Sequence, residues 1–161
     1  MITIVTGTPG TGKSSLAKAL AKHWKCKYLD VNELIDKEGL IESKDKKRET
    51  NVVDEKKLSK TLVKIIKKEK DLVIDSHMSH FIPKKYVNHC IVTKCSLKML
   101  KKRLENRGYK ASKVRENLDA EIFDICLTEA IEAGHNIIML DTTSITLKKM
   151  IQHIENAISK N

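Results

Sequence analysis

The sequence is poor in aromatic residues and in proline, and it contains no long apolar run. Aromatic side chains account for 4% of the 161 residues, which argues against an RNA-binding surface that stacks bases on aromatic rings. No stretch of about 18 apolar residues occurs, so we expect no membrane span. There are two prolines and no low-complexity segment, so no linker divides the chain. We therefore expect a single domain over residues 1–161, large enough to bury a substantial core.

Cysteine is scarce as well, and its spacing does not indicate a metal site. The four cysteines form no C-x-x-C pair. This disfavours zinc and predicts reduced, mostly buried thiols, as in a cytosolic protein. The apolar N-terminus leads directly into a glycine-rich loop, and we interpret it as a strand rather than a cleaved signal. These features favour a cytoplasmic protein.

Half of the six glycines fall in one short stretch, VTGTPGTGKSS, at residues 5–15. Gly7, Gly12, Lys13 and Ser14 fit the pattern G-x-x-x-x-G-K-S, which binds phosphate. Glycines allow a ligand to approach the backbone closely, and the N–H groups at the start of a helix form an anion site. Lys13 is expected to reach the β- and γ-phosphates, and Ser14 to bind Mg²⁺. The residues predicted to hold the nucleotide in this loop are Gly10, Thr11, Gly12, Lys13, Ser14 and Ser15.

The residues on either side of this loop have the order that a phosphate-binding loop requires. ITIV, at 2–5, is short, apolar and β-branched, which predicts a buried strand. SSLAKALAKHW, at 14–24, has apolar residues at helical spacing. We therefore predict that a nucleoside triphosphate binds here. An ordinary glycine turn is the weaker alternative.

Predicted strands and helices alternate along the chain. Strands are expected at 2–5, 27–29, 71–74, 90–93 and 136–140. Helices are expected at 14–24, 54–68, 97–107, 112–133 and 145–159. This alternation predicts an α/β fold, with helices on both faces of a parallel sheet. Ligands of such sheets lie beyond the carboxyl ends of the strands, so the two segments that fit no element, 38–53 and 107–113, are expected to cover substrates.

KDLVIDSHMSHF, at 70–81, contains a second set of candidate site residues. Asp75 ends a buried apolar strand, where an acidic residue of a P-loop enzyme holds Mg²⁺, often through water. His77 lies two residues later, on the same side of the strand end, and could position water or relay a proton. The alternatives are a turn-capping aspartate and a structural histidine. His80 has a weaker claim to a function.

Two arginines precede the second irregular segment. Arg103 and Arg107 are spaced i, i+4, so one helix face presents both guanidinium groups, and Gly108 then ends the helix. Arginines that close over a nucleotide stabilise the charge that develops on a transferring phosphoryl group. The alternative is a solvent-facing pair that bridges to glutamates such as Glu105. Of the two arginines, Arg107 is the stronger candidate.

The chain carries a net charge of +10, from 31 basic and 21 acidic residues. Solvated helix faces explain this charge most simply. Lysine clusters also neutralise nucleic-acid phosphates, so an RNA or ribonucleoprotein partner is the alternative. Charge alone does not separate the two.

The chain resembles the adenylate kinase isoenzyme 6 family over residues 1 to about 133. The resemblance lies in four motifs and in their order and spacing: GTPGTGKSS, IDSHMSHF, KRLENRGY and ENLDAEIF. The resemblance implies a P-loop domain with a five-stranded parallel sheet, an AMP-binding segment at about 30–53 and a short lid at about 106–116. It implies interconversion of ATP and AMP with two ADP, ATP hydrolysis, and help in maturing the small ribosomal subunit with a ribosomal protein and rRNA. A eukaryotic member would be nuclear. The implied site residues are Lys13, Asp75, His77, Arg103 and Arg107, with ATP also on Arg107 and Mg²⁺ on Ser14 and Asp75.

The sequence departs from this pattern in the expected AMP segment. Relatives carry an arginine in the helix after the second strand, whereas here Asp36 and Lys37 occupy that region and Arg48 is the first arginine. Lysine lacks the bidentate geometry of arginine, so the monophosphate site is less well defined than the ATP site. The main expectation is an adenylate kinase that also hydrolyses ATP. An ATP-driven assembly factor with incidental kinase activity, and a kinase for another small acceptor such as a sugar-like acid, remain alternatives.

Overall fold

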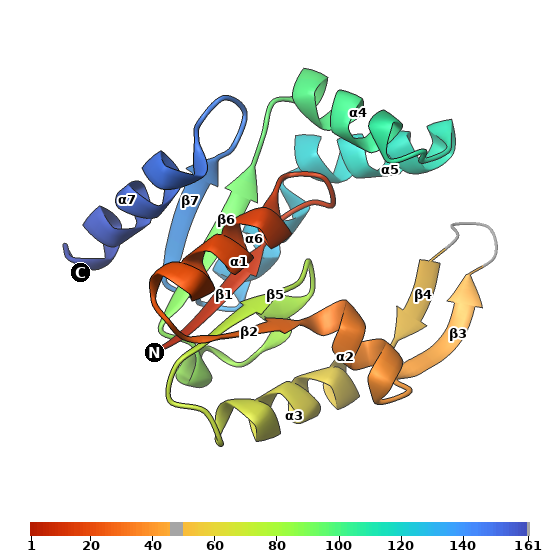
Figure 1. Ribbon diagram of the computed structural model, residues 1–161. Coiled ribbons are helices and arrows are strands. Elements are labelled where there is room, and N and C mark those ends of the chain that lie inside the picture. The colour runs from red at the N-terminus through yellow and green to blue at the C-terminus, as the bar shows by residue number, and fades with distance from the viewer. Residues whose placement is uncertain (46–49, 161) are drawn as a thin grey trace.

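A five-stranded parallel sheet forms the centre of the molecule (Figure 1). The computed structural model describes residues 1–45 and 50–160. The strands are β1 (Ile2–Thr6), β2 (Lys27–Asp30), β5 (Leu72–Asp75), β6 (His89–Lys94) and β7 (Ile137–Asp141). Their order is β2-β5-β1-β6-β7, and every neighbouring pair is parallel. The predicted parallel sheet is confirmed, with each strand within one residue of its expected ends.

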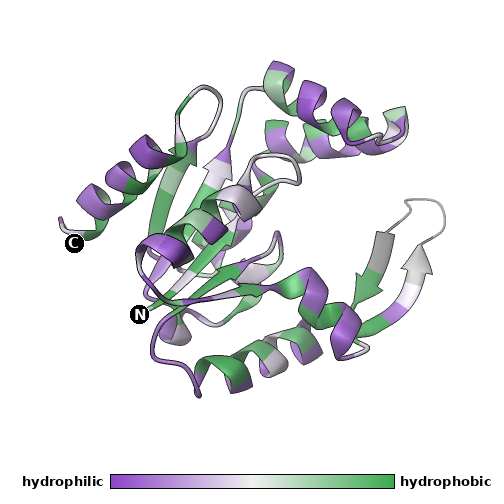
Figure 2. Ribbon diagram, in the orientation of Figure 1, coloured by the Kyte–Doolittle hydropathy of each residue, from purple (hydrophilic) through white to green (hydrophobic). Residues whose placement is uncertain are grey.

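Helices cover both faces of this sheet, as predicted. They are α1 (Lys13–His23), α2 (Val31–Lys37), α3 (Glu55–Ile66), α6 (Ile125–Glu132) and α7 (Leu147–Ile158). The helices α1 and α7 pack on one face and α2, α3 and α6 on the other. Consecutive strand residues point to opposite faces, so Val73 packs with α1 and α7 while Ile74 packs with α2 and α3. Apolar residues accordingly concentrate along the strands in Figure 2.

A helical hairpin extends beyond the carboxyl ends of the strands (Figure 1). It consists of α4 (Leu97–Asn106) and α5 (Ala111–Ile122), which enclose a small core of Leu100, Leu104 and Val114. The expected lid, about 106–116, coincides with the tip of this hairpin. Four residues, 107–110, join the helices, and Gly108 has a φ of 73° that favours glycine.

The helix predicted at 112–133 is wrong as a single element. It divides into α5 and α6 at Phe123 and Asp124, and Asp124 adopts a left-handed conformation with φ of 52°. Lys94, at the end of β6, pairs with the Asp124 carboxylate. This break lets α5 pack on α4 while α6 turns back onto the sheet. The other predicted helices are confirmed with ends shifted by one or two residues, and the Asp54 carboxylate caps α3 as expected.

The segment 38–53, which fitted no element in the sequence, contains an antiparallel pair of strands. These are β3 (Ile41–Asp45) and β4 (Thr50–Val53), which pair only with each other within the described residues. Together with α2 they make up the expected AMP-binding segment at about 30–53. Arg48 and the rest of 46–49 lie outside the described residues.

Two short 3-10 helices connect β5 to β6 on the opposite side of the sheet from α1. They are η1 (Ser79–Phe81) and η2 (Lys84–Tyr86). Among the described residues, no helix is both long and apolar enough to cross a membrane.

Candidate active site

The glycine-rich loop between β1 and α1 has the backbone geometry that its sequence predicts. Gly7, Gly10 and Gly12 have φ values of 139°, 96° and 93°. A Cβ atom on Gly7 would lie 2.4 Å from the carbonyl oxygen of Thr93, and one on Gly10 would lie 2.7 Å from Leu100 Cδ1. Larger residues are therefore excluded at these positions by both conformation and contact.

Hydrogen bonds within the loop converge on Thr8. The Thr8 carbonyl accepts bonds from the Thr11 backbone N–H (3.2 Å), the Thr11 hydroxyl (2.7 Å) and Lys13 Nζ (3.4 Å). The buried Thr11 hydroxyl also lies 2.7 Å from that of Thr93 on β6. The structure thus places the Thr11 side chain inside the loop as a support, with the Lys13 ammonium against the same Thr8 carbonyl.

Lys13 is the first residue of α1 and is half-buried. Desolvation lowers its pKa, while the negative charge of Asp75 acts in the opposite direction, and the guanidinium of Arg107 lowers it further. A partly desolvated ammonium group gains more from an incoming phosphate than a hydrated one would. Ser14 and Ser15 follow with exposed side chains on the first turn of the helix.

Asp75 lies at the carboxyl end of β5, paired in register with Val5 just before the loop. Its side chain is buried, and Tyr28 donates a hydrogen bond of 3.0 Å to Oδ2. The other oxygen, Oδ1, is buried and has no partner among the described residues. A buried carboxylate oxygen without a donor is costly unless a ligand completes it. A carboxylate and a serine hydroxyl suit a hard cation such as Mg²⁺, so Asp75 and Ser14 fit the expected metal.

His77 follows Asp75 by two residues, and its side chain is accessible to solvent. Desolvation by the chain around the ring, and secondly the positive charge of Lys13, lower its pKa to about 4. His77 is therefore neutral at pH 7 and can accept a hydrogen bond from water. It is a weaker base than a histidine with the ordinary value of about 6.5.

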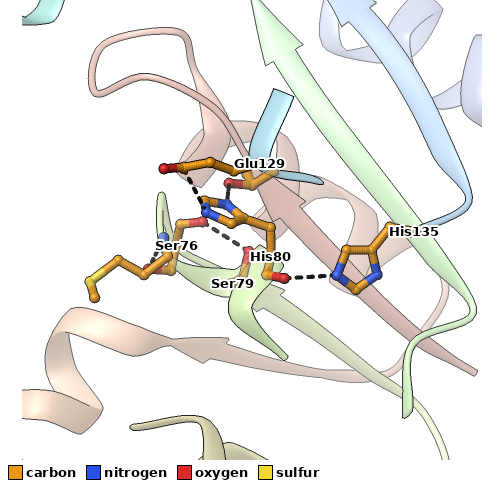
Figure 3. A network of polar contacts seen from close by, with 7 residues as sticks. Ser76, Ser79, His80, Glu129 and His135 are labelled. Atoms are coloured by element: carbon orange, nitrogen blue, oxygen red, sulfur yellow. Dashed lines mark hydrogen bonds and ion pairs between the residues drawn. The ribbon is translucent and has the colours of Figure 1, made fainter. Parts of the chain in front are cut away.

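His80 occupies a different position, inside the protein (Figure 3). Its Nδ1 lies 3.0 Å from the Thr6 hydroxyl, and its carbonyl accepts a 2.8 Å bond from His135 Nε2. Its Nε2 lies 2.9 Å from Glu129 Oε2 but is not aligned for a hydrogen bond. These contacts join β1, η1 and α6. The weak functional claim of His80 thus gives way to a structural role.

The two arginines of α4 behave differently. Arg103 donates to the Thr142 carbonyl (2.9 Å), the Thr142 hydroxyl (3.1 Å) and the Gly10 carbonyl (3.4 Å). It therefore binds the loop after β7 to the phosphate-binding loop. Arg107, the C-cap of α4, is exposed. The positive charge of Arg107 lowers the pKa of Lys13.

Both arginines line an open cleft of about 400 Å³ above the phosphate-binding loop. The loop contributes Gly10, Gly12 and Ser15. The cleft is also lined by Thr142, by Ile145 in the segment before α7, and by Leu147 and Met150 of α7. A cleft that joins phosphate-binding backbone, two guanidinium groups and an apolar wall can accept a nucleotide.

Two residues of this site were not predicted from the sequence. Glu121 of α5 is buried against the loop, where it accepts a 2.6 Å hydrogen bond from the Thr8 hydroxyl. The Thr142 hydroxyl accepts a hydrogen bond from Arg103 and donates one of 2.6 Å to the Thr11 carbonyl. Glu121 lay within the quoted ENLDAEIF motif, but nothing in the spacing indicated that it points inward. Thr142 follows a strand, and only the sheet order brings it beside the loop.

Sequence comparisons place this chain among P-loop proteins. The family model described as "AAA domain" matches residues 3–124. A protein of Methanocaldococcus jannaschii named "Putative adenylate kinase" is 38% identical over 154 residues, covering 96% of this chain and 84% of that protein. A Pyrococcus furiosus protein of the same name is 36% identical over 162 residues, covering 99% of this chain and 84% of that protein.

Solved structures share the fold at low sequence identity. Shikimate kinase from Acinetobacter baumannii, in complex with shikimate, has a TM-score of 0.71 at 14% identity, covering 99% of this chain and 93% of that one. A gluconokinase from Sinorhizobium meliloti has a TM-score of 0.59 at 14% identity, covering 98% and 91%. These similarities show the P-loop kinase fold, and the archaeal relatives support a nucleotide kinase.

Proposed function

We propose a catalytic function from the premise that this chain belongs to the AAA-domain family and, within it, to the family of archaeal proteins named "Putative adenylate kinase". The proposed reaction is transfer of the γ-phosphoryl group of ATP to AMP, giving two ADP, by a single domain over residues 1–161. We also propose that the chain is of the isoenzyme 6 type, on the motifs quoted above.

In this proposal the chain positions both phosphates and supplies no nucleophile, because the acceptor oxygen attacks in line. Backbone N–H groups from Gly10 to Ser15 and the Lys13 ammonium would hold the donor phosphates. Arg107, which is exposed and lines the cleft, would stabilise the transferring group. Arg103 would shape the cleft through its bonds to Thr142 and Gly10.

The orphaned Oδ1 of Asp75 supports a metal next to the phosphates. Ser14 and Asp75 would hold Mg²⁺, directly or through water. When bound, the ion neutralises the phosphate charge and aligns the transferring group. Tyr28 keeps the carboxylate oriented by occupying its other oxygen.

The observation that carries the proposal is the cleft itself. Its lining brings the loop glycines, Ser15 and both arginines around one volume of about 400 Å³. Isolated P-loop motifs bind phosphate in many folds, but here two arginines line the same cleft as the loop, and guanidinium groups stabilise the charge of a transferring phosphoryl group.

We assign the acceptor to the side of the site formed by α2 and the β3–β4 strands, which corresponds to the expected segment at about 30–53. The tip of the α4–α5 hairpin, with the connection 107–110 at its centre, would act as the short lid. Lys37, exposed at the end of α2, would supply a point charge where relatives carry an arginine.

A second function is favoured by His77. His77 is a neutral imidazole that feels the charge of Lys13 and follows Asp75 by two residues. Such a group suits alignment of a water molecule, so ATP hydrolysis without an acceptor is proposed as an accompanying activity. The net charge of +10 suits a ribonucleoprotein partner. In this alternative, hydrolysis assists maturation of the small ribosomal subunit, and kinase activity is incidental.

Product analysis separates these functions. ATP turnover is measured with AMP, without an acceptor, with a small-subunit ribosomal protein or rRNA fragment, and with shikimate as a hydroxy-acid acceptor. An adenylate kinase forms two ADP per ATP consumed with AMP, and little ADP otherwise. Strong stimulation by the ribosomal protein or rRNA, without AMP dependence, would establish the assembly ATPase instead. If the protein phosphorylates shikimate and does not phosphorylate AMP, both the adenylate kinase proposal and the assembly ATPase alternative are overturned.

A further inference from the structure

Glu121 is a buried carboxylate next to the phosphate-binding loop that the proposed reaction does not use. Its residue is 7% exposed, although it lies on α5 among charged surface residues. Both of its oxygens are occupied. Oε2 accepts the Thr8 hydroxyl at 2.6 Å, and Oε1 accepts the Cys95 backbone N–H at 3.0 Å.

The first of these bonds leads to Lys13. The Thr8 carbonyl accepts bonds from the Thr11 N–H, the Thr11 hydroxyl and Lys13 Nζ. Holding the Thr8 side chain therefore fixes the residue on which the internal bonds of the loop converge. A shift of Thr8 would move Lys13 away from the phosphates.

The second bond leads to the arginines. Cys95 lies between the end of β6 and Ser96, the N-cap of α4. The helix that starts there carries Arg103 and, at its C-cap, Arg107. Glu121 thus joins three parts of the site: the phosphate-binding loop, the base of α4, and α5 on the other arm of the hairpin.

The burial of this carboxylate is a cost that its two bonds offset. Removing it would leave the buried Thr8 hydroxyl without its acceptor and the Cys95 N–H unpaired, and such groups are costly to leave unsatisfied. The Thr8 hydroxyl and the Cys95 N–H each bond to a different oxygen of Glu121, and glutamine has the same shape as glutamate, so it can replace it sterically. Its oxygen can accept from Cys95 N–H, and its amide can donate to the Thr8 hydroxyl.

We propose that Glu121 is a positioning residue for phosphoryl transfer. It holds the phosphate-binding loop through Thr8 and fixes the position of this loop relative to the α4–α5 hairpin, which carries Arg103 and Arg107. The inference rests on the proposed function for its reaction, but its geometry concerns the donor side alone. It acts through Lys13 and the arginines, and it does not touch the nucleotide.

The test compares Glu121→Ala, Glu121→Gln, Thr8→Val and the double variant Glu121→Ala/Thr8→Val. Glu105→Ala, which removes an exposed glutamate of α4, serves as the matched control. Each variant is measured for kcat and KM with ATP, for affinity toward a fluorescent ATP analogue, and for its melting temperature.

Glu121→Ala is expected to lower kcat by about 10- to 100-fold, because small displacements of positioning groups cost rates of this order. Its affinity for the ATP analogue should change by less than about threefold, because the loop N–H groups still bind phosphate. Glu121→Gln should retain kcat within about threefold. The double variant should lose no more than Glu121→Ala alone, because the two residues act in one chain.

Several results would overturn the inference. These are an unchanged kcat in folded Glu121→Ala, an equal loss in Glu121→Gln, or additive losses in the double variant. If Glu121→Ala does not fold, Thr8→Val and Glu121→Gln decide the question by themselves. Should the wild-type protein fail to phosphorylate AMP, the proposed function fails. The inference is then still tested by acceptor-free ATP turnover and by analogue binding.

Discussion

In the proposed site, nucleotide binding should depend most directly on Lys13, because the loop N–H groups and this ammonium are the groups proposed to bind phosphate. Lys13→Ala is expected to abolish phosphoryl transfer and ATP hydrolysis together. The fold should persist, because within residues 1–45 and 50–160 the Lys13 side chain makes a single long hydrogen bond, to the Thr8 carbonyl. Turnover assays and a thermal melt check both statements. Unchanged turnover in a folded variant would show that the nucleotide does not bind at this loop.

Arg107 is predicted to act in the transition state rather than in binding. Arg107→Ala should lower kcat by about 10²–10⁴-fold, because cationic stabilisation of a transferring phosphoryl group has this magnitude. ATP affinity should fall much less. Steady-state kinetics distinguish the two effects, and a raised KM with an unchanged kcat would make Arg107 a uniform binding contact.

His77 separates the two leading functions. AMP presents an anionic acceptor that needs no base, whereas hydrolysis needs a positioned water. His77→Ala should therefore lower acceptor-free hydrolysis more than AMP phosphorylation, by about 10-fold or more. Since its pKa is lowered to about 4, the hydrolysis rate of the wild-type protein should not fall between pH 8 and pH 6 on account of this residue. The measurement is the ratio of the two rates in each variant at fixed Mg²⁺. Equal losses would assign His77 to the shared ATP–Mg²⁺ site, and no loss in either rate would make it structural.

At the scale of elements, the network around His80 ties β1, η1 and α6 together behind the site (Figure 3). Burial lowers the pKa of His80 to about 4, and the nearby His77 and His135 add to this effect. In the unfolded chain the pKa of this histidine has its ordinary value of about 6.5. Between about pH 6.5 and pH 4 the unfolded chain therefore binds a proton that His80 in the folded protein does not bind. Stability is therefore full above about pH 6.5 and decreases as the pH falls toward 4.

We predict that the melting temperature of the wild-type protein decreases from pH 7 to pH 5, and that His80→Asn shows a shallower decrease. The slope from His80 is at most about 1.4 kcal/mol per pH unit. Glu129 opposes it, because burial raises the pKa of this carboxyl and the folded state gains protons there, but its side chain is 40% exposed and the effect is small. Equal slopes in the two proteins would show that His80 does not control this dependence.

The whole molecule carries a charge of +10, and this property belongs to no single element. If rRNA is a partner, its affinity should fall by at least about tenfold between 50 and 200 mM salt, because lysine–phosphate contacts release counterions. Fluorescence anisotropy with a labelled rRNA fragment measures this. A salt-independent affinity would indicate recognition by contacts other than charge, and the absence of binding at low salt would favour the kinase over the assembly factor.

The sequence alone determined the sheet, the helices on both faces and the phosphate-binding loop, because each depends on local periodicity and on glycine conformations that neighbouring residues specify. Asp75, His77 and both arginines could be named as candidates because they follow a predicted strand or end a predicted helix, within motifs that resemble a known family. Tertiary structure decided what those residues contact. It turned Arg103 toward Thr142, buried Glu121 against Thr8 and buried His80 against Thr6. It also divided the helix predicted at 112–133, because packing on α4 and on the sheet requires two directions that one straight helix cannot provide. These outcomes depend on residues far apart in the chain, and local patterns contain no information about such pairs.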